Sequence, residues 1–412
     1  MVNQRFNRLL SWPDPSLRPY GSVSIVVDDD DDQEGSLPPS LIEKYIVKRA
    51  AGFKRVCFQS GCAVGEGQPS RILMHKFFAA SLPQIAALFA KYHVELDIEV
   101  FQGGHLLFPD PGHPVHPDDD DNNEGEDFSA EYWQVLSPVL TKLYLMIGAD
   151  EIDIDSQAWL NSMQKLQHLE MHGFENEDRF QPVLFGTSNL SLSALKLLRL
   201  ENFSSVPDWH LDCPSLEALH LTNIQGLCVP TGLGSCSRLT TLDVAAPLDP
   251  VHVDVYGGLP AAIKSVQQTL EVLDISGWSP ALNGILALLS SLPRLHTLVA
   301  QRMGLAAVPA LPATLKSLDL RANEFTEVPV QLESLTQLTS LALSSKESFA
   351  HFQIRRPLDR LIGLPHLRKL TLVLDSEVHN PAYTRWGARS LYYLGLAQHE
   401  IARSRSSLLL KF

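Results

Sequence analysis

The sequence predicts an α/β solenoid, in which short parallel strands form a curved sheet on the concave face and helices, 3₁₀ turns and loops cover the convex face. One frame of apolar residues at offsets 0, 3 and 5 recurs eleven times, and successive frames start 20 to 31 residues apart. A unit of this length cannot bury its own apolar face, so neighbouring units stack. With 412 residues, of which 45% are hydrophobic, the chain is long enough for such an array.

The apolar frame also defines the strand of each unit. Offsets 3 and 5 fall on one side of a strand, and offset 0 enters it pointing the same way, so these residues are expected to form the core. Offsets 2, 4, 6 and 7 are expected to point away from that core. The eleven frames start at Leu140, Leu166, Leu195, Leu216, Leu239, Leu270, Leu295, Leu315, Leu338, Leu367 and Leu391.

The unit that starts at Leu315 has the fullest pattern, LKSLDLRANEF, with Asn323 at offset 8 and Phe325 at offset 10. This pattern, LxxLxLxxNxL, resembles the leucine-rich repeat family. An asparagine at offset 8 can bond backbone groups where the chain leaves the strand. Among the frames only Asn323 matches this position, so the other turns are expected to depend on different packing.

The convex connections are expected to alternate between helices and tight turns. The segments AAVP at 306–309 and TEVP at 326–329 end in proline, which favours an extended or 3₁₀ return. Residues 281–292 have the apolar spacing of an α-helix.

Residues 36–139 are expected to form two or three longer, divergent repeats. The frame survives in FKRVCF at 53–58 and in HVELDI at 93–98, residues 71–92 have a helical pattern, and Ser129 is a candidate N-cap. An acidic insertion at 109–127 interrupts them as a loop. We therefore divide the chain into an N-terminal tail with an acidic loop (1–35), divergent repeats (36–139), and regular repeats with a C-terminal cap (140–412).

The net charge of −14 is concentrated in two acidic runs. Residues 28–34 hold six acids and residues 118–127 hold seven, out of 47 acids in the chain. The remaining 34 acids nearly balance the 33 basic residues. A neutral body lacks the basic face that nucleic acids and anionic membranes require, so we predict neither as a partner.

Cysteine content and hydropathy indicate a compartment without disulfides or membrane anchoring. Five unevenly placed cysteines are too few for a disulfide framework in this chain, and the odd number fits a reducing compartment. No segment reaches the ~18 to 20 apolar residues of a membrane span, and the N-terminus lacks the apolar core of a secretory signal. The expected location is the cytoplasm, with the nucleus or the cytoskeleton, including the ciliary axoneme, as alternatives.

No catalytic or metal-binding motif stands out. The sequence has no phosphate loop and no GxSxG, HExxH or GxGxxG motif, so we predict no enzyme and no cofactor. His113, His116 and Asp118 come nearest to a metal site. Prolines between them hold the backbone extended, and we interpret the stretch as a solvated acidic loop.

The predicted concave face is the candidate partner-binding surface, because function in a parallel solenoid usually resides there. Three of its offset-4 residues are aspartates near the middle of the array. Two interpretations remain: a mixed-charge groove for a basic or polar segment of a partner protein, or polar side chains that only keep the strands soluble. The candidate residues are His168, Glu170, Arg199, Glu201, His220, Asp243, Asp274, Asp319, Arg321, Lys369 and Tyr393.

The first 27 residues combine a helical pattern, a turn and a strand. Val2, Phe6, Leu9 and Leu10 have helical spacing, WPDPSL at 12–17 favours a turn, and GSVSIVV at 21–27 predicts a strand. This order resembles the closing helix and exit of an F-box that leads into leucine-rich repeats. The resemblance implies that these four apolar residues face the adaptor-binding helices, which precede this part of an F-box and would lie before Met1.

The F-box resemblance implies substrate recognition for a Skp-cullin ubiquitin ligase, with a Skp-type adaptor as a second partner. The repeats by themselves fit an alternative, a cytoskeletal, axonemal or signalling scaffold with no ligase role. In both interpretations the protein binds another protein.

Overall fold

The computed structural model describes residues 22–28, 46–47, 50–61, 84–100, 134–147, 160–173, 189–203, 209–224, 229–246, 258–278, 283–325, 328–345, 361, 364–374 and 409–411. The chain divides into two compact units. Unit 1 comprises residues 1–216 and 226–236, and unit 2 comprises residues 217–225 and 237–412.

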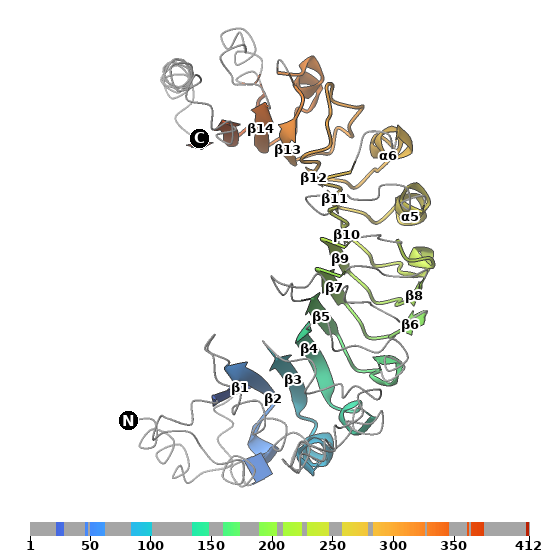
Figure 1. Ribbon diagram of the computed structural model, residues 1–412, viewed down its shortest axis with the longest axis vertical. Helices are drawn as coiled ribbons and strands as arrows, with labels where there is room; N and C mark the ends of the chain where they lie inside the picture. The colour runs from blue at the N-terminus through green and yellow to red at the C-terminus, as the bar shows by residue number, and fades with distance from the viewer. Residues whose placement is uncertain are drawn as a thin grey trace, which may run out of the picture. The chain divides into compact units, whose positions relative to one another are not determined.

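In unit 1, six of the described strands form a parallel sheet that follows the order of the sequence (Figure 1). Each strand of this sheet pairs with the next strand of the same sheet, as expected when every repeat adds one strand. The strands are β1 (Ser22–Asp28), β2 (Arg55–Gly61), β3 (Glu95–Val100), β4 (Leu140–Ile147), β5 (His168–Gly173) and β7 (Leu197–Glu201).

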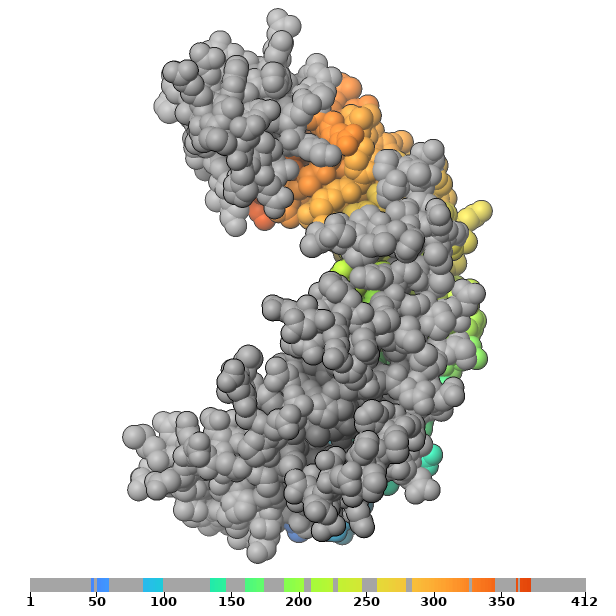
Figure 2. All heavy atoms as spheres, viewed as in Figure 1, coloured from blue at the N-terminus to red at the C-terminus, as the bar shows by residue number. Residues whose placement is uncertain are grey.

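Unit 2 continues the same principle with its own parallel strands, again paired in sequence order. In the space-filling view, the residues around β12 to β14, coloured yellow to orange, form one continuous surface (Figure 2). The strands are β9 (Ala218–Thr222), β10 (Thr241–Asp243), β11 (Val272–Asp274), β12 (Thr297–Val299), β13 (Ser317–Asn323), β14 (Ser340–Ser345), β15 (Lys369–Leu374) and β16 (Leu409–Lys411).

The apolar frame forms the core of both units. Leu166, Leu169 and Met171 occupy offsets 0, 3 and 5 of one frame, and all three are fully buried. The frame that starts at Leu315 is buried in the same way. The predicted α/β leucine-rich repeat solenoid is therefore confirmed, because the residues that the frame assigns to the core are the ones that lie there.

The connections contain short helices and tight turns, as the sequence predicts. In unit 2, α5 (Leu259–Ser265) packs beside α6 (Asn283–Leu289), and α6 lies within the helix expected at 281–292 (Figure 1). The 3₁₀ turns include η1 (Ala50–Gly52), η4 (Leu233–Ser235) and η6 (Val330–Ser334), and Pro329 is the N-cap of η6. The helix expected at 71–92 is described over 84–92.

The first and last strands of the large sheet, β1 and β16, concern two different predictions: a strand at 21–27 and a C-terminal cap. The strand expected at 21–27 is β1, which pairs in parallel with β2. At the other end, β15 pairs with β16, formed by residues 409–411 of the tail that was expected to cap the core. The frame expected at Leu391, with Tyr393, lies outside the described residues. On the side away from β14, β15 therefore pairs with β16, a strand that the repeat frame did not predict.

In five frames the residue at offset 7 has a left-handed backbone conformation. Asn202, Asn223, Gly277, Arg302 and Ala322 have φ angles between 52° and 80°. Glycine adopts this conformation freely and asparagine tolerates it, whereas alanine and arginine lose roughly 1 to 2 kcal/mol there. The backbone of these five repeats therefore turns at the same offset, whichever residue type occupies it.

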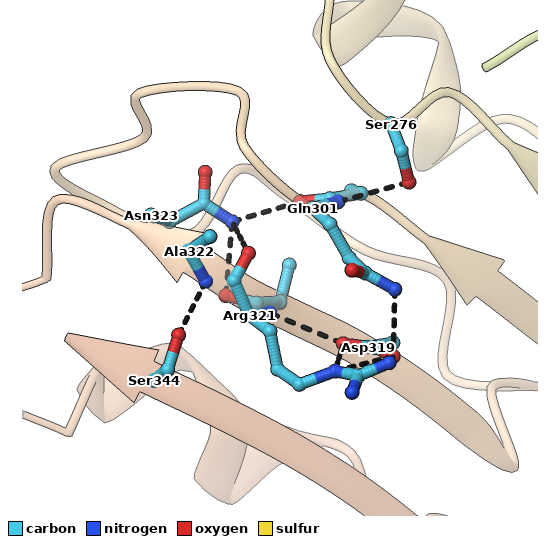
Figure 3. Close-up of polar contacts among 9 residues, drawn as sticks. Ser276, Gln301, Asp319, Arg321, Ala322, Asn323 and Ser344 are labelled. Carbon is cyan, nitrogen blue, oxygen red and sulfur yellow. Dashed lines mark hydrogen bonds and ion pairs between the residues drawn. The ribbon is translucent and has the colours of Figure 1, made fainter. Parts of the chain in front are cut away.

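Asn323 bonds the backbone at one such strand exit, as predicted. The side chain is fully buried, and its Nδ2 donates to the carbonyl oxygens of Ala300 and Leu320 at 2.8 and 2.9 Å. Its Oδ1 accepts from the backbone N–H groups of Met303 and Leu305, both at 3.1 Å. One carboxamide thus satisfies backbone groups of two successive repeats (Figure 3).

Trp278 occupies offset 8 in the frame that starts at Leu270. It is 2% exposed, and its Nε1–H donates to the carbonyl oxygen of Val244 at 2.5 Å. Val244 stands at offset 5 of the preceding frame, the same position that Ala300 holds relative to Asn323. Tryptophan therefore replaces one of the asparagine bonds and fills the remaining space with its ring.

Candidate partner-binding face

The side chains at offsets 2, 4 and 6 form the surface that we call the polar sheet face. Along β5, β7 and β9, partly exposed residues alternate with buried ones. The pleat of a strand turns successive side chains to opposite sides, so the buried leucines place the others on the far side. The described candidate residues, from His168 to Lys369, lie on this face of their own unit.

In unit 1, the candidate residues of β5 and β7 stand side by side. Glu170 is in register with Arg199, and their charged groups are 3.8 Å apart. His168 is in register with Leu197, which adds an apolar side chain to this face. The Glu170–Arg199 pair is partly exposed, so it contributes little to stability and leaves both groups within reach of a partner.

His172, at offset 6 of the same strand, has a more enclosed position. Its Nδ1 lies 3.0 Å from Oε2 of Glu201, and its ring is 5.0 Å from the ring of Tyr144. Its Nε2 is buried without a hydrogen-bond partner among the described residues. The candidate Glu201 is therefore engaged by a neighbour in its own sheet.

Four polar residues on β2, β3 and β4 extend this face and were not among the predicted candidates. Nη2 of Arg55 lies 2.6 Å from Oε2 of Glu95, and Nε of Arg55 lies 3.6 Å from Oδ2 of Asp97. Thr141 donates to Oδ1 of Asp97 at 2.8 Å. Burial raises the pKa of Asp97, against the opposing effects of Thr141 and Arg55. Counting offsets 2 and 4 in the two upstream frames would have found Arg55, Glu95 and Asp97.

In unit 2, the strand register places the offset-4 residues in one row. His220 is paired with Asp243, which is paired with Asp274, and Val299 then separates Asp274 from Asp319. The three aspartates therefore lie on one line, as their spacing predicts. Adjacent strands are about 4.8 Å apart, so neighbouring carboxylates in the row repel one another.

Each aspartate of this row also has a role within its own strand. The Oδ1 atoms of Asp243, Asp274 and Asp319 accept the backbone N–H two residues further on, at 3.3, 2.8 and 3.1 Å. This bond satisfies a backbone group where the chain begins to leave the strand. The repeated aspartate is therefore partly structural, whatever else it binds.

The three aspartates have different side-chain partners. Asp243 lies 3.1 Å from Nδ1 of His220. Asp319 binds the guanidinium of Arg321 through Nε and Nη2, at 3.0 and 2.7 Å, and also accepts from Nε2 of Gln301 at 3.0 Å (Figure 3). Both carboxylates are thus paired within the sheet.

Asp274 has no such partner, since no basic side chain of the described residues lies within ion-pair distance of it. Its hydrogen bonds come from the backbone and hydroxyl of Ser276. Burial raises its pKa first, and the charges of Asp243 and Asp319 raise it further. The middle of the row therefore holds a partly buried carboxylate whose charge the described residues do not neutralise.

Of the remaining candidate residues, Lys369 lies within the described part of the chain and the others lie outside it. Lys369 is exposed at the start of β15. Tyr393, and the predicted adaptor-facing residues Val2, Phe6, Leu9 and Leu10, lie outside the described residues, as do His113, His116 and Asp118. Within the described residues, no cluster of three metal-ligating side chains occurs, and no helix is long and apolar enough to cross a membrane.

Comparison with known proteins yields fold-level likenesses. No protein-family model matches the chain, and no curated protein matches it. A leucine-rich repeat protein of Leptospira interrogans is similar at 12% identity, with a TM-score of 0.33 over 89% of this chain and 92% of that one. A leucine-rich repeat protein of Bacteroides thetaiotaomicron is similar at 14% identity, with a TM-score of 0.23 over 79% of this chain and 44% of that one. Because these scores are low, the fold assignment rests on the frame and strand register of this chain.

Proposed function

We propose that the protein is a non-enzymatic binding protein that holds a basic or polar segment of a partner protein against its polar sheet face. The observation that supports this best is Asp274, a partly buried carboxylate in a partly exposed row, with no basic side chain beside it in the described residues. Such a carboxylate gains stabilisation from an external cation, because a nearby opposite charge offsets the desolvation that raises its pKa.

The test compares proteins captured by the wild type with those captured by a triple variant, Asp243→Asn, Asp274→Asn and Asp319→Asn. Asparagine keeps the oxygen that accepts each backbone N–H, so the strands remain satisfied while three charges are removed. We expect partner capture to fall most at low salt, where exposed charges act over the longest distance.

A matched control removes three acids from elsewhere in unit 2. Glu217, Glu324 and Glu333 are exposed and lie off the polar sheet face. Changing all three to glutamine gives the same net charge as the triple aspartate variant. We expect this control to retain its partners. If both triple variants captured equally little of the partner, overall charge, and not the aspartate row, would determine binding.

A narrower form of the proposal is substrate recognition for a Skp-cullin ubiquitin ligase. It is supported by the resemblance of residues 1–27 to the end of an F-box, of which only β1 falls within the described residues. Co-purification with a Skp-type adaptor tests it, with Phe6→Ser and Leu10→Ser as variants expected to release the adaptor. Partner capture without any adaptor complex would favour the cytoskeletal or signalling scaffold.

A further inference from the structure

Two buried cysteines of unit 1 occupy the same position in successive repeats. Cys213 and Cys236 each stand three residues before the first leucine of a frame. Cysteine can fill such a position as a small apolar residue, but it can also form a covalent bond with a second cysteine. Other frames place a buried apolar residue at this point, among them Met163, Leu192 and Leu292.

The segments that carry the two cysteines are bonded to each other. Cys213 directly follows β8 (His210–Asp212), which pairs with β6 (Asn189–Ser191) in a second, smaller parallel sheet. Thr231, five residues before Cys236, forms a bridge to His210 of β8. The smaller sheet therefore reaches from one cysteine-bearing segment toward the other.

Three hydrogen bonds complete the contact between these segments. The N–H of Thr231 donates to the carbonyl oxygen of Trp209, and the N–H of Leu211 donates to the carbonyl oxygen of Thr231, both at 2.9 Å. The hydroxyl of Ser235 donates to the carbonyl oxygen of Leu211 at 3.3 Å. Residues 209–213 and 231–236 thus lie side by side.

The two thiols lie at this contact. The backbone of Cys213 forms a hydrogen bond with the sulfur of Cys236, and the thiol of Cys213 donates to the carbonyl oxygen of Leu190 at 3.7 Å. Neighbouring segments of a parallel sheet are about 4.8 Å apart, and a disulfide requires Cα atoms roughly 4.4 to 6.8 Å apart. The spacing of successive repeats therefore fits a disulfide between these two residues.

Both thiols are protected in the reduced protein. Burial raises the pKa of Cys213 to about 12, and burial also raises the pKa of Cys236. The thiolate is the reactive form, so the pair stays reduced while the segments remain closed. Cys236 also receives a hydrogen bond from the side chain of Ser235, which favours its thiolate and makes it the better first reactant.

We propose that Cys213 and Cys236 form an oxidation site, at which hydrogen peroxide converts the two thiols into a disulfide between successive repeats. When the segments open locally, the thiolate of Cys236 attacks one oxygen of the peroxide, forms a sulfenic acid and releases hydroxide. The thiol of Cys213 then attacks that sulfur, so the S–S bond forms, the S–O bond breaks and water leaves. The hydroxide takes the proton of the Cys236 thiol, so two thiols and one peroxide give one disulfide and two waters.

The disulfide would fasten two segments that hydrogen bonds alone hold together in the reduced protein. A covalent link restricts local opening, so backbone groups at the contact should become better protected from solvent. The amides of Leu211 and Thr231 report this directly, because both donate across the contact. The site does not depend on the proposed partner-binding function.

The experiment treats the native full chain with hydrogen peroxide and maps its cysteines by mass spectrometry without reduction. We expect a linked peptide pair that contains Cys213 and Cys236, with a mass two hydrogens below the sum of the separate peptides. The amides of Leu211 and Thr231 should exchange hydrogen more slowly than in the reduced chain, and dithiothreitol should restore the original rates. Peroxide is raised until Cys57, which is partly exposed, reacts with it. The proposal is overturned if no Cys213–Cys236 pair has appeared by then, or if the pair forms only in denaturant.

Two variants assign the effect to this pair. Cys57→Ser removes a thiol outside the pair, so both the link and the slower exchange should persist. Cys236→Ala removes one member, so peroxide should no longer slow the exchange of Leu211. Cys236→Ser replaces it if the alanine variant does not fold. Slower exchange in the Cys236 variant would show that oxidation elsewhere is the cause and would overturn the role of the pair.

Discussion

Two repeats of unit 2 solve the same structural problem with different residues. The repeats that start at Leu270 and Leu315 both have an aspartate at offset 4, a left-handed residue at offset 7 and a hydrogen-bond donor at offset 8. The second repeat uses asparagine as that donor, and the first uses tryptophan. The geometry of the strand exit is therefore shared, while the chemistry that holds it is not.

The difference shows which part of the repeat pattern is essential. Asn323 bonds both carbonyl and N–H groups of the turn, whereas Trp278 has a single donor and adds a buried ring. A turn held by hydrogen bonds requires a particular side chain, because a buried backbone group without a partner is costly. A turn held mainly by packing accepts several large apolar residues, which explains why Phe203, Ile224 and Met303 are buried at offset 8 elsewhere.

The largest expected effect is that of removing the carboxamide of Asn323. Asn323→Ala leaves buried backbone groups of two repeats without partners, and we expect a loss of about 3 to 5 kcal/mol in the free energy of unfolding. Denaturant unfolding of the full chain measures it. A loss below about 1 kcal/mol would mean that water replaces the amide and that this turn also depends on packing.

The corresponding change in the other repeat should be smaller. Trp278→Phe keeps most of the ring but removes the Nε1–H, so only the carbonyl of Val244 loses a partner. We expect a loss of about 1 to 3 kcal/mol, measured in the same way. A loss equal to that of Asn323→Ala would contradict the distinction between the two turns.

Exchanging the offset-7 residues should produce opposite effects. Gly277→Ala introduces a Cβ at φ 80°, 3.1 Å from the carbonyl oxygen of Ala246, and should destabilise the fold by about 1 to 2 kcal/mol. Ala322→Gly removes the strain at φ 57° and should stabilise it by up to about 1 kcal/mol. Thermal melting of both variants checks the signs, and two effects of the same sign would exclude backbone strain as their cause.

The smallest expected effect concerns the aspartates. Asp274→Asn keeps the acceptor for Ser276 and removes a like-charge repulsion of about 0.8 kcal/mol, so the variant should be slightly more stable than the wild type at neutral pH. Asp319→Asn instead removes the partner of Arg321 and should be slightly destabilising.

The pH dependence of Asp274 has a defined sign. Its pKa is raised in the folded state, so its contribution lowers stability as the pH rises from the ordinary aspartate value through the folded pKa. Below the ordinary value the contribution vanishes. The Asp274→Asn variant should therefore lose less stability than the wild type as the pH rises through this range. Parallel pH profiles of the two proteins would show that the charge of Asp274 does not affect folding.

The sequence predicted which side of each strand is buried, but it did not predict the side-chain contacts between neighbouring repeats. Leucine spacing assigned the core residues and the outward row of Asp243, Asp274 and Asp319, since both depend only on the alternation of side chains within a strand. The pairing of Asp319 with Arg321 was also within reach of local spacing. The engagement of His172 by Glu201, and of Asp97 by Thr141, was not predicted, because each pair joins residues of different repeats.

The sequence by itself therefore determined the repeat, its core and the side of each strand that carries polar groups, because periodicity within one unit suffices for these. The tertiary structure decided the placement of β16 beside β15, the substitution of Trp278 for an asparagine and the uncompensated charge of Asp274. Each of these depends on an adjacent coil, which brings together residues that lie in different parts of the sequence.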